Sequence, residues 1–338
     1  MNKVGWTIIS LLVIFSLIII AILNREPTPD PNITLKVEDQ QGKIKVSVSA
    51  PFQFDQVTFY LNGKIYYRAY SSQIASDSAT LKRGVVTFIF DDGWVDVFDN
   101  AHPLLNKYHY PASVATISRY VDKRGAMTKR QLQKLVNKGW SLSSHSFSDD
   151  PITDLPQNMW EAALIESKLY LWQNLWGATT LVYPSGKTND TISELAKKHY
   201  LASRIYDNGL NILPVDRYQI LVRSLDVESD LDDIRMWIKE AELQKGWLVF
   251  ALHHVSDKDL GFYTITPELL EETLKILTQS NVQVLDFDQA VQAISPEVAG
   301  IKENLATWEF DKNLLKSGEY NIQVVINGKY SNKTIMRI

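Results

Sequence analysis

Residues 85–94 constrain the fold of this chain more than any other stretch, because a run of β-branched and aromatic residues ends there in two adjacent acids, Asp91 and Asp92. An unbroken apolar run bounded by turn residues is typical of a strand buried on both faces of a sheet. The carboxylates would then lie at the C-terminal end of that strand, where parallel α/β proteins place their sites. Two neighbouring carboxylates favour a nearby cation or a shared proton. The alternative is a polar turn, in which Gly93 supplies the positive φ.

Strand-like and helix-like segments alternate from this strand to residue 294. Repeated strand–helix units of this size predict a parallel sheet, either open or closed into a barrel. We expect seven units, one fewer than in the common barrel, and therefore predict an α/β fold with a distorted (β/α)7 barrel. The expected strands are residues 85–90, 113–117, 140–143, 179–183, 201–205, 247–252 and 282–285, and the expected helices are residues 100–108, 128–138, 158–176, 191–199, 231–243, a helix that opens at Thr266, and 287–294.

Segments with strand-like alternation and turn signals flank the barrel region on both sides. Four strands are expected in residues 33–70 and three in residues 307–338, which together make the seven strands of a sandwich. Residues 57–64 and 318–328 resemble hairpins of bacterial immunoglobulin-like domains. We therefore predict one immunoglobulin-like sandwich that is interrupted by the barrel. The alternative is two separate β extensions that each pack on the barrel.

Residues 6–23 at the N-terminus are almost wholly apolar and carry no charge. As a helix they would extend about 27 Å, close to the hydrocarbon thickness of a bilayer. The alternative is a cleaved signal peptide, but residues 20–23 offer no small-residue cleavage site. We therefore expect a single-pass cell-membrane anchor with the globular part outside the cytoplasm. The expected domains are the anchor and a proline-rich spacer (1–31), the first part of the sandwich (32–76), the barrel (77–298) and the second part of the sandwich (299–338).

The composition narrows the chemistry and the partners. The chain has no cysteine, so thiolate metal sites and cysteine nucleophiles are excluded, and any metal must be held by histidine and carboxylates. The formal net charge of −4 shows no basic bias, which argues against nucleic acid as a partner.

Several polar residues follow the C-terminal ends of predicted strands, which meet at one rim of a parallel barrel. Asp92, His145 and Asp149 would bring one imidazole and two carboxylates to one ion, because His145 and Asp149 are four residues apart. This donor set suits zinc first, with manganese or cobalt as alternatives. A metal supplies a nucleophilic water at neutral pH, and Asp91 would accept a proton from it while His253 protonates the leaving group.

These residues resemble the motifs of the polysaccharide deacetylases, the NodB-homology carbohydrate esterases. Residues 87–93, His145 with its partner four residues on, residues 183–186 and residues 252–253 have the order and spacing of that family, and the resemblance covers residues 84–294. It implies a deformed (β/α)7 barrel that removes acetyl groups from N-acetylated sugars of a cell wall or exopolysaccharide. It further implies that the backbone N–H of Tyr183 helps to stabilise the oxyanion.

The chain departs from the family pattern at two places. The second motif normally ends in histidine where this chain has Asp149, and the added negative charge favours harder metals. The third motif often has an arginine just before Tyr183, where this chain has Leu181 and Val182. We expect a partner for Asp91 elsewhere, near Arg223 or Asp226.

Aromatic residues near the rim offer faces for sugar rings. We assign substrate contacts to Trp94, Pro184 and Phe262, with ordinary packing as the alternative for the two aromatic residues. The alternative function is a catalytically weak or inactive carbohydrate-binding surface protein, which Asp149 favours. The retained Asp91 and His253 favour the enzyme, because a binding protein needs neither a base nor an acid.

Overall fold

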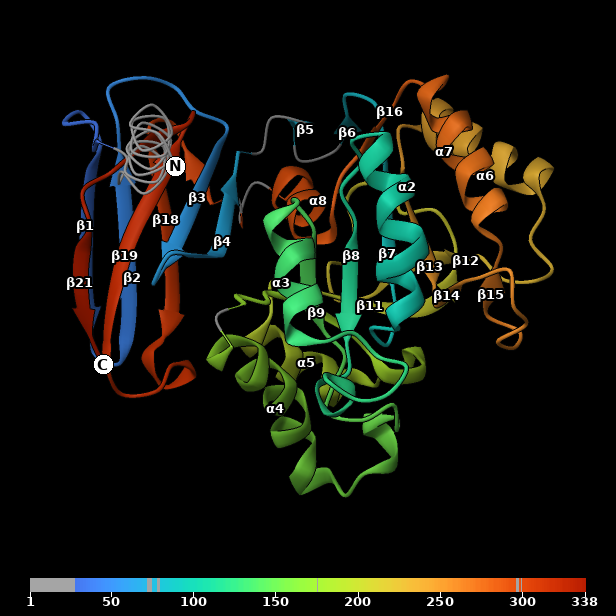
Figure 1. The fold of residues 1–338 in the computed structure, drawn as a ribbon, viewed down its shortest axis with the longest axis horizontal. Coiled ribbons are helices and arrows are strands. Elements are labelled where there is room, and N and C mark those ends of the chain that lie inside the picture. The colour runs from blue at the N-terminus through green and yellow to red at the C-terminus, as the bar shows by residue number, and fades with distance from the viewer. Residues whose placement is uncertain (1–27, 72–74, 78–79, 175, 296–297, 299) are drawn as a thin grey trace, which may run out of the picture.

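The computed structural model describes residues 28–71, 75–77, 80–174, 176–295, 298 and 300–338. Two bodies lie side by side in it, a barrel surrounded by helices and a pair of β-sheets built from both ends of the described chain (Figure 1). The membrane anchor predicted over residues 6–23 lies outside the described residues. Within them, no helix has the length and apolarity that crossing a membrane requires.

Within the described residues, seven parallel strands close into a barrel, which confirms the predicted α/β barrel class. Each strand pairs with the next one along the chain, and β13 pairs back onto β7, from Trp247 opposite Val85 to Leu252 opposite Phe90. Every residue of β7 is buried, as its apolar run predicts. The barrel strands are β7 (Gly84–Phe90), β8 (Ser113–Thr116), β9 (Ser141–Ser144), β10 (Thr180–Val182), β11 (Ala202–Asn208), β12 (Ile220–Ser224) and β13 (Trp247–Leu252).

The barrel is distorted beside β7. One edge of β7 is occupied by β13, so its other partners, β8 and β16 (Val282–Val284), share the second edge. β8 pairs only with Ile89 and Phe90, and β16 pairs with residues 84–86. β7 and β8 therefore separate toward their N-terminal ends, and β16 fills the space between them.

The sequence analysis counted the barrel strands correctly but chose one of them wrongly. The segment predicted over residues 282–285 forms β16, which lies outside the closed ring. The strand that completes the ring is β12, between β11 and β13, which the sequence analysis missed. Three of its five residues are only partly buried and one of them is Arg223, so β12 lacks the apolar run that identifies a buried strand.

Helices surround the barrel, and most of them begin where cap residues predict (Figure 1). Thr128 caps α3 and Thr266 caps α7, each accepting a backbone N–H with its side chain. The helix predicted over residues 191–199 begins earlier than predicted, as α5, because Asn189 caps it by accepting the N–H of Ile192. The helices are η1 (Val97–Ala101, a π-helical turn), α2 (His102–Lys107), α3 (Lys129–Asn137), α4 (Trp160–Gln173), α5 (Asp190–His199), α6 (Leu231–Gln244), α7 (Pro267–Thr278) and α8 (Phe287–Ile294).

The β segments from the two ends of the chain pair with each other rather than separately. β18 runs antiparallel to β2 in one sheet, and β19 runs antiparallel to β3 in the other. The two sheets share one apolar core, which includes Phe59 and Trp308 with ring centroids 5.7 Å apart. The immunoglobulin-like type and the boundaries at 32–76 and 299–338 stay predictions. The sheets comprise β1 (Thr34–Gln40), β2 (Lys43–Ser49), β18 (Leu305–Asp311) and β17 (Ile301–Lys302), and β20 (Lys329–Tyr330), β19 (Glu319–Ile326), β3 (Gln56–Leu61), β4 (Lys64–Tyr70) and β21 (Thr334–Arg337).

A buried amide joins the sheets to the barrel at α8, which lies beside β4 in Figure 1. The side chain of Gln292 is fully buried, accepts the N–H of Tyr70 at 3.0 Å and donates to the carbonyl of Arg68 at 3.0 Å. The indole of Trp172 from α4 lies against Phe310 of β18, with ring centroids 5.3 Å apart. The junction therefore combines apolar packing with hydrogen bonds that satisfy its buried polar groups.

Candidate active site

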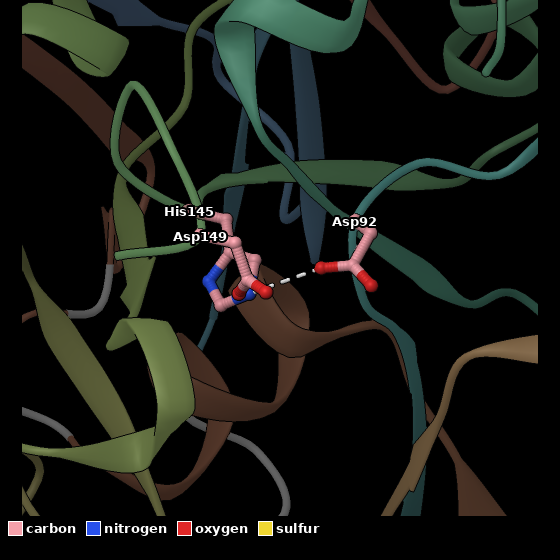
Figure 2. A group of neighbouring side chains, drawn as sticks. All are labelled: Asp92, His145 and Asp149. Atoms are coloured by element: carbon pink, nitrogen blue, oxygen red, sulfur yellow. Dashed lines mark ion pairs between the residues drawn. The ribbon is translucent and has the colours of Figure 1, made fainter. Parts of the chain in front are cut away.

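The polar residues singled out in the sequence lie at the C-terminal rim of the barrel. Asp91 and Asp92 follow β7, His145 follows β9 and His253 follows β13. Candidate ligand atoms of Asp92, His145 and Asp149 all lie within 4.8 Å of one another. Figure 2 shows His145 and Asp149 side by side on one segment, facing Asp92 on another. The structure thus brings together the three residues that the sequence analysis chose as metal ligands.

Asp92 has an unusual backbone conformation and two different carboxylate environments. Its φ is 70° and is followed by a φ of 84° at Gly93, so the chain turns sharply as β7 ends. One oxygen, Oδ2, accepts the indole N–H of Trp94 at 2.9 Å. The other, Oδ1, lies 3.5 Å from Nε2 of His145. Burial opposes ionisation of Asp92, but His145, then His253 and the Trp94 N–H, outweigh it and lower its pKa.

His145 is oriented by the strand next to its own. Its Nδ1 lies 2.8 Å from the carbonyl of Val182 in β10, so Nδ1–H donates there and Nε2 faces the candidate metal group. The ring is almost completely buried. Burial alone would lower its pKa, but the hydrogen bond with Asp92 and the charges of Asp91 and Asp92 raise the pKa of His145.

Asp149 is exposed and completes the group. Partial desolvation, then the charge of Asp92, raises the pKa of the Asp149 carboxyl. Two carboxylates that disfavour each other's ionisation beside an imidazole nitrogen form a donor set that fits a divalent cation, which would remove the repulsion. The identity of the metal is a separate question from this fit.

Asp91 is held by an arginine that the sequence analysis did not assign. The guanidinium of Arg204, in β11, forms a direct ion pair with Oδ2 of Asp91, and both residues are almost completely buried. The expectation of a partner near Arg223 or Asp226 was wrong, because Arg223 bonds instead to Asn208 and Glu240. A signal existed. Arg204 lies inside the strand predicted over 201–205, and arginine is almost never fully buried unless it is paired.

His253 approaches the same carboxylate oxygen of Asp91 as Arg204 does. Its Nε2 is 3.8 Å from Oδ2 of Asp91, and its ring stacks on Tyr263 with centroids 4.6 Å apart. Its Nδ1 is buried, and no hydrogen-bond partner for it is found among the described residues. The imidazole is thus placed by stacking and directs Nε2 toward the centre of the rim.

The oxyanion role predicted for Tyr183 does not fit the structure. Its backbone N–H donates to the carbonyl of Arg204 at 3.1 Å as part of the sheet, and is therefore not available to a substrate. Its hydroxyl accepts from Ser203 at 3.0 Å, and its side chain packs with Ile192 and Ala196 of α5. A residue at the end of a parallel strand continues the hydrogen-bond ladder, a constraint that the motif alone did not reveal.

The predicted substrate residues have three different environments. Trp94 is partly buried and bonds to Asp92, Pro184 is buried, and Phe262 is 49% exposed. Phe262 therefore has the most accessible ring of the three. Their contacts with a sugar stay predictions.

The comparisons with known proteins agree with this geometry. Residues 78–203 match the family model for polysaccharide deacetylase. This segment is therefore similar to a polysaccharide deacetylase domain. The match includes Asp91, Asp92, His145 and Asp149. It ends at Ser203, before Arg204 and His253.

Two bacterial relatives match the deacetylase domain. YxkH of Bacillus subtilis (strain 168), named provisionally as a polysaccharide deacetylase, is 27% identical over 115 residues, which are 33% of this chain and 41% of that protein. A poly-beta-1,6-N-acetyl-D-glucosamine N-deacetylase of Staphylococcus epidermidis is 28% identical over 125 residues, which are 32% of this chain and 43% of that protein. The matched segment thus spans less than half the length of each relative.

Solved structures of deacetylases are also similar to this chain. A T48 deacetylase with substrate has 18% sequence identity and a TM-score of 0.45, covering 64% of this chain and 93% of that one. A family 4 carbohydrate esterase from Streptomyces lividans in complex with acetate has 15% identity and a TM-score of 0.42, covering 66% of this chain and 97% of that one.

Proposed function

We propose that this protein is a metal-dependent deacetylase of N-acetylated polysaccharide, such as the N-acetylglucosamine polymer of a cell wall or exopolysaccharide. The observation that carries the proposal is the pairing of Asp91 with Arg204 directly beside the group formed by Asp92, His145 and Asp149. It places a carboxyl group that is paired with a guanidinium, and that does not belong to the ligand group, next to a candidate cation site. A structural cation site has no use for such a base.

The three ligand residues would hold zinc in the first instance, with manganese or cobalt as alternatives. A bound divalent metal supplies Lewis acidity toward the acetyl carbonyl and lowers the pKa of a nearby water. Asp149 in place of a histidine adds negative charge, which weakens both effects and favours harder metals. We therefore expect a stronger response to manganese or cobalt than a site with two histidines would show.

The remaining side chains supply the proton transfers. Asp91, whose Oδ2 is paired with the Arg204 guanidinium, accepts a proton from the attacking water. His253, whose Nε2 lies 3.8 Å from Oδ2 of Asp91, donates a proton to the leaving amine. Arg204 also prevents Asp91 from turning toward the ligand group, so the base and the ligands keep separate roles.

Acetate release from N-acetylglucosamine oligomers tests the proposal. The full chain is stripped with EDTA and assayed with added Zn²⁺, Mn²⁺ or Co²⁺, and Asp91→Asn serves as the matched inactive control. We expect release that depends on the metal and is lost in the variant. Absence of metal-dependent release from any N-acetylated or O-acetylated glycan would overturn the proposal.

The second candidate function is a carbohydrate-binding protein with a weak or inactive barrel. The exposed Asp149 at a position where the family normally has histidine favours it. Glycan binding by the full chain, measured by calorimetry and unchanged in Asp91→Asn, together with no acetate release, would select this candidate.

We propose further that the protein is anchored in the cell membrane by residues 6–23, with its globular part outside the cytoplasm and with the two β-sheets forming an immunoglobulin-like domain. The apolar run supports the anchor, and the pairing of β2 with β18 and of β3 with β19 supports a single sheet domain. Fractionation of cells that produce the full chain, followed by protease treatment of intact cells, tests the anchor and its orientation.

A further inference from the structure

Trp94 occupies one of the two oxygens of the candidate ligand Asp92. Its indole N–H donates to Oδ2 at 2.9 Å, while Oδ1 lies 3.5 Å from Nε2 of His145. A carboxylate can bind a cation through one oxygen or through both. With Oδ2 held by the indole, Oδ1 is the oxygen that stays directed at the imidazole.

The position of the Trp94 ring depends on a second pair of residues. The ring stacks on His254, with centroids 4.9 Å apart and an interplanar angle of 27°. Nδ1 of His254 lies 2.6 Å from Oδ2 of Asp96, which precedes the turn η1. Both side chains of this pair are mostly buried, so neither is free to turn into solvent. The ring is also near Tyr120, at 5.9 Å on a tilted plane.

We propose that Asp96 and His254 act as positioning residues that hold the Trp94 indole on Asp92, so that Asp92 binds the cation through Oδ1 alone. The proposal rests on the proposed function only in that it requires a cation at Asp92. It assigns a role to His254, which directly follows the candidate acid His253 but points to a different partner. Hydrogen-bond partners of metal ligands commonly change metal affinity 10–100-fold when they are removed.

The experiment measures Co²⁺ binding to the full chain by calorimetry and by visible absorption, without substrate. Trp94→Phe keeps an aromatic ring on His254 but removes the donor, and we expect affinity for Co²⁺ to fall about 10-fold or more. The freed oxygen can then also coordinate, so the cobalt spectrum should weaken, because absorption falls as the coordination number rises. Asp96→Asn and His254→Ala should shift affinity and spectrum in the same direction by less.

His102 provides a matched control, because its ring stacks on Phe98 at 5.4 Å as the ring of His254 stacks on Trp94. It lies beside Trp140, which precedes β9, whereas the candidate ligand His145 follows that strand. We expect His102→Ala to change stability at most, and to leave Co²⁺ affinity and spectrum as in the unsubstituted chain. Thermal unfolding identifies any variant that fails to fold, and Asp96→Asn, which keeps the size of the side chain, then decides.

Unchanged affinity and spectrum in folded Trp94→Phe and Asp96→Asn would overturn the inference, as would absence of Co²⁺ binding by the unsubstituted chain. If the variants change Co²⁺ binding as expected but the unsubstituted chain releases no acetate, only the proposed function would be overturned.

Discussion

Two closely spaced pairs of aspartates lie at opposite ends of the barrel and contact different kinds of groups. The rim pair, Asp91 and Asp92, follows β7 and contacts Arg204 and His145. The floor pair, Asp286 and Asp288, follows β16 near the first residues of β9 and β10. It accepts hydrogen bonds from neutral groups, the amide of Gln289 at 2.9 Å and the hydroxyl of Thr180 at 2.8 Å, as two examples.

The difference in partners shifts the pKa of Asp92 at the rim and the pKa values of the floor pair in opposite directions. At the rim, His145 is foremost among the groups that outweigh burial and lower the pKa of Asp92. At the floor, burial raises the pKa of Asp286 to about 6, and burial together with the charge of Asp286 raises the pKa of Asp288 to about 7. The pKa of the same residue type is thus lowered at Asp92 at one end of the barrel and raised at Asp286 and Asp288 at the other.

The largest expected effect is on activity at the rim. Asp91→Asn removes the proposed base but keeps its shape, and acetate release should fall roughly 10²–10⁴-fold. Asp286→Asn, the matched change at the floor, should leave acetate release near that of the unsubstituted chain. Steady-state kinetics with the preferred metal measures both, and equal losses in the two variants would break the comparison.

The next effect concerns stability at the rim. Arg204→Met leaves the buried Asp91 carboxylate without its cation, and the free energy of unfolding should fall by about 3–5 kcal/mol. Asp91→Asn in the same chain should restore part of this loss, because the neutral amide no longer needs the guanidinium. Urea unfolding of both single variants and the double variant measures the coupling, which would be zero if the two groups acted independently.

A smaller loss is expected where the floor meets the β-sheets. Gln292→Leu leaves the N–H of Tyr70 and the carbonyl of Arg68 unpaired, at a cost of about 2–3 kcal/mol in unfolding free energy. The exposed Gln279 offers the same change as a control, which should cost little. Similar losses at both positions would show that the junction is not held by these hydrogen bonds.

The smallest expected effect is on the pH dependence of stability, in which the floor pair of aspartates should differ from the rim pair. The folded pKa of Asp288 is raised above its ordinary value of 3.8, so the native state binds more protons than the unfolded state between about pH 4 and pH 7. The stability contribution of Asp288 is therefore full below pH 4 and is lost as the pH rises through about 7. Asp288→Asn should equal the unsubstituted chain in stability near pH 4 and should exceed it increasingly as the pH rises to 8.

Chemical unfolding at several pH values measures this difference. The exposed Glu166 provides a control, since Glu166→Gln should not produce a difference that grows with pH. A gap between Asp288→Asn and the unsubstituted chain that stays constant from pH 4 to pH 8 would contradict a raised pKa at the floor.

Features that depend on neighbouring residues were predicted best. β7 and β13 were found because each is a continuous apolar run, and the caps at Thr128 and Thr266 were found because capping acts within one turn of helix. The convergence of Asp92, His145 and Asp149 followed from one rule, that the C-terminal ends of parallel strands meet.

Features that depend on pairing between distant strands were not predictable in this way. Arg204 of β11 reaches Asp91, which follows β7, because the sheet closes into a ring. The N–H of Tyr183 is taken by Arg204 because those strands are in a particular register. β12 was missed because three of its five residues are only partly buried and it lacks a long apolar run.

By itself, the sequence determined which segments become strands and helices and which side chains end at the rim, because burial and capping act over a few residues. Only the tertiary structure decided which partner each buried acid meets, and with it which acids stay ionised. The interaction that sets a pKa acts through space over a few ångströms, and the group that does most to lower the pKa of Asp92, His145, is brought to it by the pairing of distant strands.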